Sequence, residues 1–208
     1  MKITCSDIAK KYQGQWIFSG FSFLFSEGSK TAIIGFNGSG KSTLLSILSG
    51  YTTPNKGSIL HEVNNIEIAK DSVYKYFSIG SPYLELPEEL NSMELINTFK
   101  NFKPFSENLN TKEILDLLML DTNQDKPVKY FSSGMKQRLK IGMAILSDTP
   151  LLLLDEPLSN LDQEGCRWFE NLMNNYINKK TVIIASNKVE AEIKHCDTTI
   201  DISEYKKS

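Results

Sequence analysis

The segment 35–42 combines residue types that bind phosphate groups. It reads Gly-Phe-Asn-Gly-Ser-Gly-Lys-Ser, which matches the pattern G-x-x-x-x-G-K-[ST]. Glycines let successive backbone N–H groups converge on an anion, and a helix that begins at the end of such a loop adds its positive end. The pattern therefore predicts a site for a nucleoside triphosphate. The residues expected to bind it are Asn37, Gly38, Ser39, Gly40, Lys41, Ser42 and Thr43.

Two side chains of this loop have distinct expected tasks. Lys41 carries the charge to reach the β- and γ-phosphates, and the hydroxyl of Ser42 is an oxygen ligand suited to Mg²⁺. The competing interpretation is a glycine-rich turn that merely joins a strand to a helix. Because an apolar run at 31–34 precedes the loop and a helical pattern follows it, the flanking sequence favours the phosphate loop.

A pair of acidic residues follows a second apolar run. Four consecutive leucines at 151–154 lead into Asp155 and Glu156, so both carboxylates stand at the C-terminal end of an expected buried strand, where ligands of α/β sheets bind. We expect Asp155 to hold Mg²⁺ opposite Ser42, and Glu156 to polarise the water that attacks the γ-phosphate. The alternative is a solvated acidic pair at a strand end.

The charge balance argues against a nucleic-acid partner. The 208 residues include 23 Lys and Arg against 25 Asp and Glu, a net charge of −2, so the chain has no overall basic field. Cys5, Cys166 and Cys196 lack a C-x-x-C spacing, which favours reduced thiols over disulfides or a zinc site. No apolar run approaches the ~20 residues that a membrane span requires. We therefore expect any link to a membrane to come through another chain.

Hydrophobic periodicity predicts an α/β fold with a parallel sheet covered by helices on both faces. The expected strands are 2–8, 16–26, 31–34, 58–60, 66–68, 75–80, 151–154 and 181–185. The expected helices are 41–49, 88–102, 111–120, 132–147 and 161–178, and a short helix and strand end the chain. The two aromatic-rich strands at the start suit an antiparallel flap beside the nucleotide. We expect one domain, 1–208, with a small helical subdomain inserted over approximately 86–140.

Three phenylalanines recur at every third position in the helical region. Phe99, Phe102 and Phe105 are interleaved with Lys100 and Lys103. One interpretation is internal packing of the small helical subdomain. The other is an apolar surface that receives a helix of a partner protein.

The order of the motifs gives the chain a family resemblance. The phosphate loop is followed by Phe-Ser-Ser-Gly-Met-Lys-Gln-Arg at 131–138, then by the leucine run with Asp-Glu-Pro, then by Ser-Asn-Leu-Asp at 159–162. In this order and spacing, nearly the whole chain resembles the ATP-binding subunit of an ABC transporter. The resemblance implies a P-loop NTPase fold, ATP and Mg²⁺ as cofactors, and ATP hydrolysis that powers transport.

The resemblance also implies partners. Ser132, Ser133 and Gly134 correspond to the start of the family signature L-S-G-G-Q, which closes over the nucleotide of a facing copy, and Asp162 falls in the contact between the copies. This implies a head-to-tail homodimer or heterodimer of ATPase subunits. It also implies an integral-membrane permease, which would hold the chain on the cytoplasmic face of the cell membrane. The alternative for the signature is a plain serine-capped helix. Tyr12 falls where the family has an aromatic that stacks on adenine, and the alternative there is packing on the sheet edge.

Three departures from the family concern hydrolysis more than binding. Where the family has a glutamine before the helical insert, this chain has Ser81 and its neighbours; Asn187 replaces a histidine, and Met135 replaces the signature glutamine. By resemblance, the catalytic residues are Glu156, Lys41 and Asn187. One hypothesis is an ATP-hydrolysing motor subunit of reduced activity. The other is an ATP-gated clamp with weak or no hydrolysis, as the regulatory half of a heterodimer or in a non-transport assembly. Retention of Glu156 favours the first.

Overall fold

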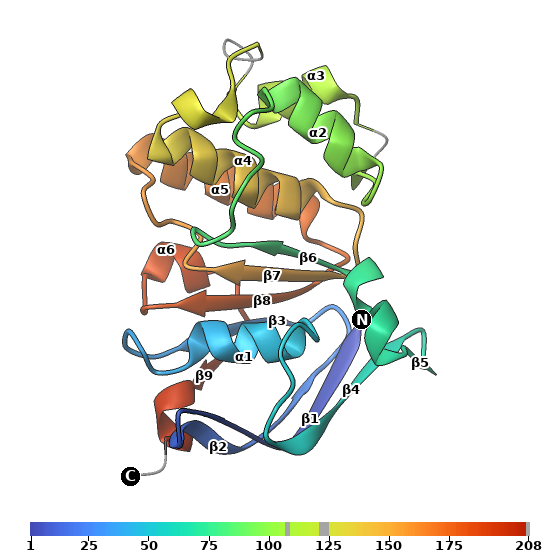
Figure 1. Cartoon of the computed structure of the whole chain (residues 1–208), viewed down its shortest axis with the longest axis vertical. Coiled ribbons are helices and arrows are strands. Elements are labelled where there is room, and N and C mark those ends of the chain that lie inside the picture. The colour runs from blue at the N-terminus through green and yellow to red at the C-terminus, as the bar shows by residue number, and fades with distance from the viewer. Residues whose placement is uncertain (107–108, 121–124, 207–208) are drawn as a thin grey trace.

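The computed structural model describes residues 1–106, 109–120 and 125–206. In these ranges the chain forms a five-stranded parallel sheet and a four-stranded antiparallel sheet, with helices packed around them (Figure 1). This arrangement confirms the predicted α/β fold with an antiparallel flap and a group of helices at one end. No helix within the described ranges is both long enough and apolar enough to cross a bilayer.

The parallel sheet has the strand order β6-β7-β8-β3-β9. Its strands are β3 (Lys30–Ile34), β6 (Phe77–Gly80), β7 (Leu151–Asp155), β8 (Thr181–Ser186) and β9 (Thr198–Asp201). Along β7, Leu152 and Leu154 belong to one hydrophobic cluster, whereas Leu151 and Leu153 belong to another. Since successive side chains of a strand point to opposite faces, both faces of the sheet are covered, as the leucine run predicts.

Helices bury each face of this sheet. The first cluster includes residues of α4 (Ser133–Leu146) and α5 (Gln163–Tyr176), which lie beyond β6 in Figure 1. The second cluster includes residues of α1 (Lys41–Leu48) on the opposite face. The short helix α6 (Glu190–Ile193) follows β8 and contacts it. Short 3₁₀ helices complete the connections; they are η1 (Lys70–Lys75), η4 (Val128–Tyr130) and η5 (Ile202–Tyr205).

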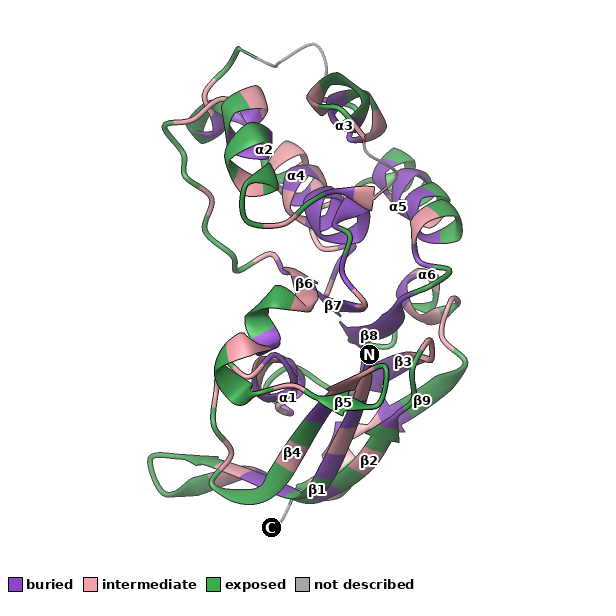
Figure 2. Ribbon diagram, turned by 90° about the vertical axis from the view of Figure 1, so that its right-hand side faces the viewer, coloured by how far each residue is buried: buried purple, intermediate pink, exposed green. Residues whose placement is uncertain are grey.

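The antiparallel sheet packs against the α1 side of the molecule. Its strands are β1 (Lys2–Tyr12), β2 (Gln15–Phe25), β4 (Lys56–Val63) and β5 (Ile66–Glu67), in the order β2-β1-β4-β5. Phe18, Phe21 and Phe25 of β2 are fully buried in the same cluster as Leu44 of α1. The alternating purple and green of these strands in Figure 2 shows one buried face and one exposed face.

Capping decides where the helices begin and end. The helix expected over 88–102 is α2 (Ser92–Lys100), because Asn91 and Glu94 form a capping box that starts it. The helix expected over 111–120 is α3 (Thr111–Leu117), and Met119 beyond its end has a φ of 56°, a conformation that ends a helix. The strand expected from residue 75 starts at Phe77, because η1 occupies the preceding residues. Helix α4 continues past residue 140, so the subdomain limits of 86–140 stay a prediction.

The three regularly spaced phenylalanines do not share one surface. Phe105 is 5% exposed, and its ring lies 5.7 Å from that of Phe99, which is partly buried. Phe102 is 80% exposed. Phe105 therefore belongs to the interior, and the apolar-surface interpretation applies only to Phe99 and Phe102.

Candidate functional site

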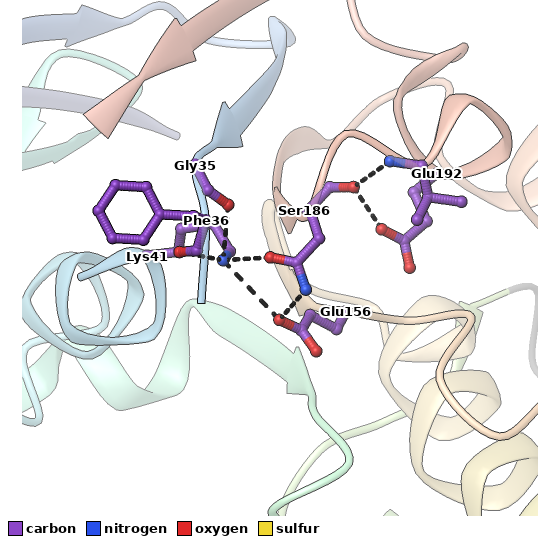
Figure 3. Close-up of polar contacts among 8 residues, drawn as sticks. Gly35, Phe36, Lys41, Glu156, Ser186 and Glu192 are labelled. Carbon is purple, nitrogen blue, oxygen red and sulfur yellow. Dashed lines mark hydrogen bonds and ion pairs between the residues drawn. The ribbon is translucent and has the colours of Figure 1, made fainter. Parts of the chain in front are cut away.

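Lys41 is the centre of a polar cluster at one edge of the parallel sheet (Figure 3). Its ammonium group donates to the carbonyl oxygens of Gly35 at 3.0 Å and Phe36 at 3.3 Å, and to Oδ1 of Asn187 at 2.6 Å. The same nitrogen lies 3.8 Å from Oε1 of Glu156. Nδ2 of Asn187 donates to that oxygen at 2.9 Å. The structure thus brings the three residues predicted to act in catalysis into mutual contact.

Three neighbouring strands place these groups. β3 leads into the phosphate loop, β7 leads into Glu156, and β8, which lies between them, leads into Asn187. Because parallel strands end at the same edge of a sheet, the three loops converge although they are far apart in the sequence. Asn187 stands between the other two side chains because its strand is the middle one.

Two glycines allow the phosphate loop to pack tightly. At Gly40, with a φ of 105°, a Cβ atom would lie 2.6 Å from Cγ2 of Ile17; at Gly35 it would lie 2.5 Å from Oγ of Ser39. Neither position accepts a side chain unless a neighbour moves. Gly40 is also the N-cap of α1, and among the described residues no side chain caps that end. The first N–H groups of α1 are therefore available to an anion.

Ser42 and Asp155 provide oxygen atoms suited to a divalent cation. Asp155 is buried, and its Oδ1 has no hydrogen-bond partner among the described residues. Burial raises the pKa of Asp155, a hydrogen bond from Ser42 opposes that shift, and the charge of Glu156 adds to it. An unpaired buried carboxylate oxygen beside a hydroxyl fits Mg²⁺. The described residues contain no group of three His, Cys, Asp or Glu that could hold a metal, so the remaining ligands would come from phosphate or water.

A pocket of about 360 Å³ opens beside the polar cluster. Its lining residues are Ile17, Asn37, Gly38, Gly40, Lys41, Ser42, Thr43, Tyr83 and Glu156. The pocket unites residues of the predicted phosphate loop with Glu156, whereas Ser39 of the same loop is buried and does not line the pocket. Tyr12 is not among the lining residues; its ring lies at the end of β1, 5.0 Å from Nζ of Lys10. Ile17 and Tyr83 also line the pocket and were not predicted, because neither belongs to a local motif.

Ser81 and Tyr83 occupy the turn where the family has its glutamine. Ser81 is buried and its Oγ accepts a hydrogen bond from the backbone N–H of Tyr83 at 3.3 Å. Tyr83, and not Ser81, lines the nucleotide pocket. Leu84, the next residue, lines a separate apolar groove of about 370 Å³. Other apolar residues of that groove include Leu86, Leu90, Leu95, Phe99, Phe102 and Met143.

A second pocket of about 390 Å³ lies at the start of α4. It is lined by the predicted signature residues Ser132, Ser133 and Gly134, by Asp162, and also by Met119, Met135, Arg138, Asn160 and Leu161. Within the chain, Ser132 caps α4 through the N–H of Met135 at 3.2 Å, and Asp162 caps α5 through the N–H of Gly165 at 2.8 Å. Nη2 of Arg138 lies 3.9 Å from Oδ1 of Asp162, so the two helix starts are also connected by charge. The signature residues and Asp162 therefore share one pocket, and none of them lines the nucleotide pocket.

The phosphate loop on a parallel sheet, with an acidic strand end beside it, defines the class of P-loop nucleotide-binding proteins. Comparison with known proteins narrows this class. The family model described as "ABC transporter" matches residues 18–159. An uncharacterised ABC transporter ATP-binding protein of Bacillus subtilis, YcbN, is 32% identical over 96% of this chain and 66% of its own length. The lantibiotic transport ATP-binding protein SrtF of Streptococcus pyogenes is 32% identical over 91% of this chain and 81% of its own length.

Solved structures agree on the fold. A putative ABC transporter ATP-binding protein of Pyrococcus furiosus superposes with a TM-score of 0.82 over all of both chains, at 21% identity. A dimeric ATP-binding cassette described as a post-hydrolysis state bound to ADP and Pi has a TM-score of 0.78, at 20% identity, over 97% of this chain and 95% of its own. The chain belongs to the ABC transporter family, as the nucleotide-binding subunit that powers a transporter.

Proposed function

We propose that this subunit hydrolyses ATP in the pocket formed by the phosphate loop, Glu156 and Asn187. The observation that supports this most strongly is the contact of Asn187 with both Lys41 and Glu156. It holds a cationic group that would face the γ-phosphate beside a carboxylate that would face the attacking water. The alternative of an ATP-gated clamp outside transport is not favoured by the relatives, which are transport ATP-binding proteins.

The phosphates would bind to the backbone N–H groups of residues 37–43 and to Lys41, which would exchange its bond with Asn187 for a phosphate oxygen. Ser42 and Asp155 would hold Mg²⁺, which when bound neutralises charge on the phosphate oxygens. Tyr12, whose side chain is half exposed at the turn between β1 and β2, would stack on the adenine ring.

In the chemical step, Glu156 would accept the proton of a water molecule whose oxygen bonds to the γ-phosphorus while the bond to ADP breaks. Asn187 would orient the Glu156 carboxylate by its amide hydrogen bond. An amide remains neutral where an imidazole can gain a proton, and Ser81 is buried away from the pocket. We therefore propose slower hydrolysis than a site with the family glutamine and histidine supports.

The second pocket supports a dimer. Ser132, Ser133 and Gly134 lie away from the subunit's own nucleotide pocket, and exposed serine hydroxyls at a helix start favour an anion. We propose that they close over the nucleotide of a facing ATPase subunit, with Asp162 at the junction. The apolar groove between α2 and α4 would receive a helix of an integral-membrane permease, which would keep the subunit at the cytoplasmic face of the membrane.

The test of hydrolysis is phosphate release by the purified chain with Mg²⁺ and ATP, compared with Glu156→Gln. The variant should lower kcat by about 100-fold or more, the range for loss of a general base, while equilibrium ATP binding is retained. Glu190→Gln changes an exposed carboxylate of α6 and serves as the control. Equal kcat in wild type and Glu156→Gln would contradict the proposal.

A further inference from the structure

Glu192 is a buried acidic residue behind the proposed catalytic cluster. It belongs to α6 and is 2% exposed. In the part of the chain that the structure describes, no cationic side chain forms an ion pair with it. Burial raises the pKa of Glu192, hydrogen bonds from Ser186 and Leu158 oppose that shift, and the carboxylates of Glu156 and Asp155 add to it. A carboxyl group buried without a cation destabilises a fold, so its presence needs a reason beyond packing.

The Glu192 side chain joins two turns. Its Oε1 accepts a hydrogen bond from the backbone N–H of Leu158 at 3.0 Å, and its Oε2 accepts one from the hydroxyl of Ser186. Oγ of Ser186 in turn accepts from the N–H of Val189 at 3.1 Å. Figure 3 shows Ser186 between Glu192 and the cluster around Lys41. Leu158 lies in the turn after β7, and Ser186 is the last residue of β8, at the start of the turn that carries Asn187, so a single carboxylate holds both turns.

The same two turns carry the groups proposed to act on ATP. Glu156 opens the first turn with a φ of 43°, and Lys188 in the second turn has a φ of 67°. Non-glycine residues adopt such angles only where their surroundings hold them. On the pocket side, Asn187 and Glu156 join the turns by one exposed hydrogen bond. On the buried side, Glu192 joins them.

We propose that Glu192 is a positioning residue for ATP hydrolysis, which fixes the separation of the Glu156 and Asn187 turns from the buried side of the sheet edge. This inference rests on the proposed function. Across the described residues, the side-chain hydrogen bonds of Glu192 go to Leu158 and Ser186 and not to the phosphate loop, whose residues would hold the nucleotide. Its loss should therefore displace the base relative to the attacking water and leave the affinity for ATP unchanged.

The first measurement separates kcat from nucleotide binding. Glu192→Ala should lower kcat by about 10- to 100-fold, the cost of a small misplacement of a catalytic group, with the Kd for ATP within about twofold of wild type. Glu192→Gln keeps the volume and an acceptor oxygen for the N–H of Leu158, but its NH2 group cannot accept the hydrogen bond that Ser186 donates, so its kcat should lie between those of wild type and Glu192→Ala. Glu190→Ala, on the exposed side of α6, should match wild type. Wild-type kcat in both Glu192 variants, or an equal loss of ATP binding, would overturn the proposal.

The second measurement is amide hydrogen exchange of the nucleotide-free chain. Exchange at Leu158 and Val189 should be faster in Glu192→Ala, and in Glu192→Gln if the alanine variant does not fold, but not in Glu190→Ala. Unchanged exchange at both amides would overturn the proposal. If wild type shows no hydrolysis that depends on Glu156, the proposed function fails, and the exchange data still decide whether Glu192 holds the two turns.

Discussion

Asn187 is the residue whose side chain uses both halves of its amide at the site. Oδ1 accepts from Lys41 and Nδ2 donates to Glu156, so one group sets the distance between a cation and a carboxylate. A histidine at this position can also donate and accept, but it titrates near neutral pH. With asparagine at position 187, the residue between the cation and the carboxylate does not itself change charge near neutral pH, as a histidine there would.

Removal of this amide gives a prediction at the level of one residue. Asn187→Ala should lower kcat by about 10- to 100-fold, because a hydrogen bond to a charged partner contributes ~1.5–3 kcal/mol. Steady-state phosphate release checks this, with Lys188→Ala as the control because Lys188 is exposed and pairs with Asp201 instead. A variant with full kcat would show that Asn187 does not orient Glu156.

Local motifs named most residues that line the pocket beside Lys41, and the lining residues outside motifs were missed; that this pocket binds the nucleotide stays a proposal. The glycine pattern and the acidic strand end each lie within a few consecutive residues, so their chemistry can be predicted from the sequence before the fold is known. Tyr83, Ile17 and Glu192 reach the site only through tertiary packing. Tyr12, assigned by resemblance, lies at the end of β1 outside the pocket lining, and its contact with adenine stays a prediction.

At the scale of elements, α1 depends on a histidine from the antiparallel sheet. The buried ring of His61 on β4 donates from Nε2 to the carbonyl oxygen of Leu48 at 2.8 Å, at the end of the helix that Lys41 begins. Burial lowers the pKa of His61, and the hydrogen bond to Leu48 opposes that shift. The protonated ring is thus disfavoured in the folded chain.

The sign of the resulting pH dependence follows from this shift. As pH falls through the unfolded value of 6.5, the unfolded ring binds a proton before the folded one, so stability from the neutral ring is lost below that pH. Urea unfolding at pH 5.5 and pH 7.5 should show a larger loss of stability in wild type than in His61→Gln. The difference between the two proteins isolates the ring from other titrating groups, including His195, and an identical loss in both would contradict the assignment.

Element types followed from periodicity, whereas element ends did not. The leucine run of β7 and the apolar faces of α4 and α5 each extend over a whole element, and their residues are buried in the fold as the patterns predict. The capping box at Asn91 starts α2 at Ser92, although the helical spacing of apolar residues predicts a helix from residue 88. A side-chain cap of this kind stabilises a helix start by about 1 kcal/mol, which is enough to move the first residue of the helix by several positions.

At the scale of the whole molecule, the regularly spaced phenylalanines have different roles. Phe102 lines the apolar groove, whereas Phe105 lies in the hydrophobic core. Phe102 lines the groove and is exposed, so Phe102→Asp should abolish co-purification with the proposed permease while ATP binding persists. Phe105 is buried in the main cluster, and Phe105→Asp should lower the unfolding temperature by about 10 °C or more, since it buries an unpaired charge. Co-purification and thermal unfolding measure the two effects. Retained permease binding in Phe102→Asp would exclude the groove as the docking surface.

The order of the parallel sheet has a consequence for biosynthesis. Among the described strands, β3, which leads into the phosphate loop, pairs with β8 and β9, and both of these strands come from residues 181–201. During synthesis, β3 therefore has neither of these partner strands until residues 181–201 have left the ribosome. We therefore expect the phosphate loop of the nascent polypeptide to become ordered only after β8 and β9 have left the exit tunnel, well after the loop residues themselves.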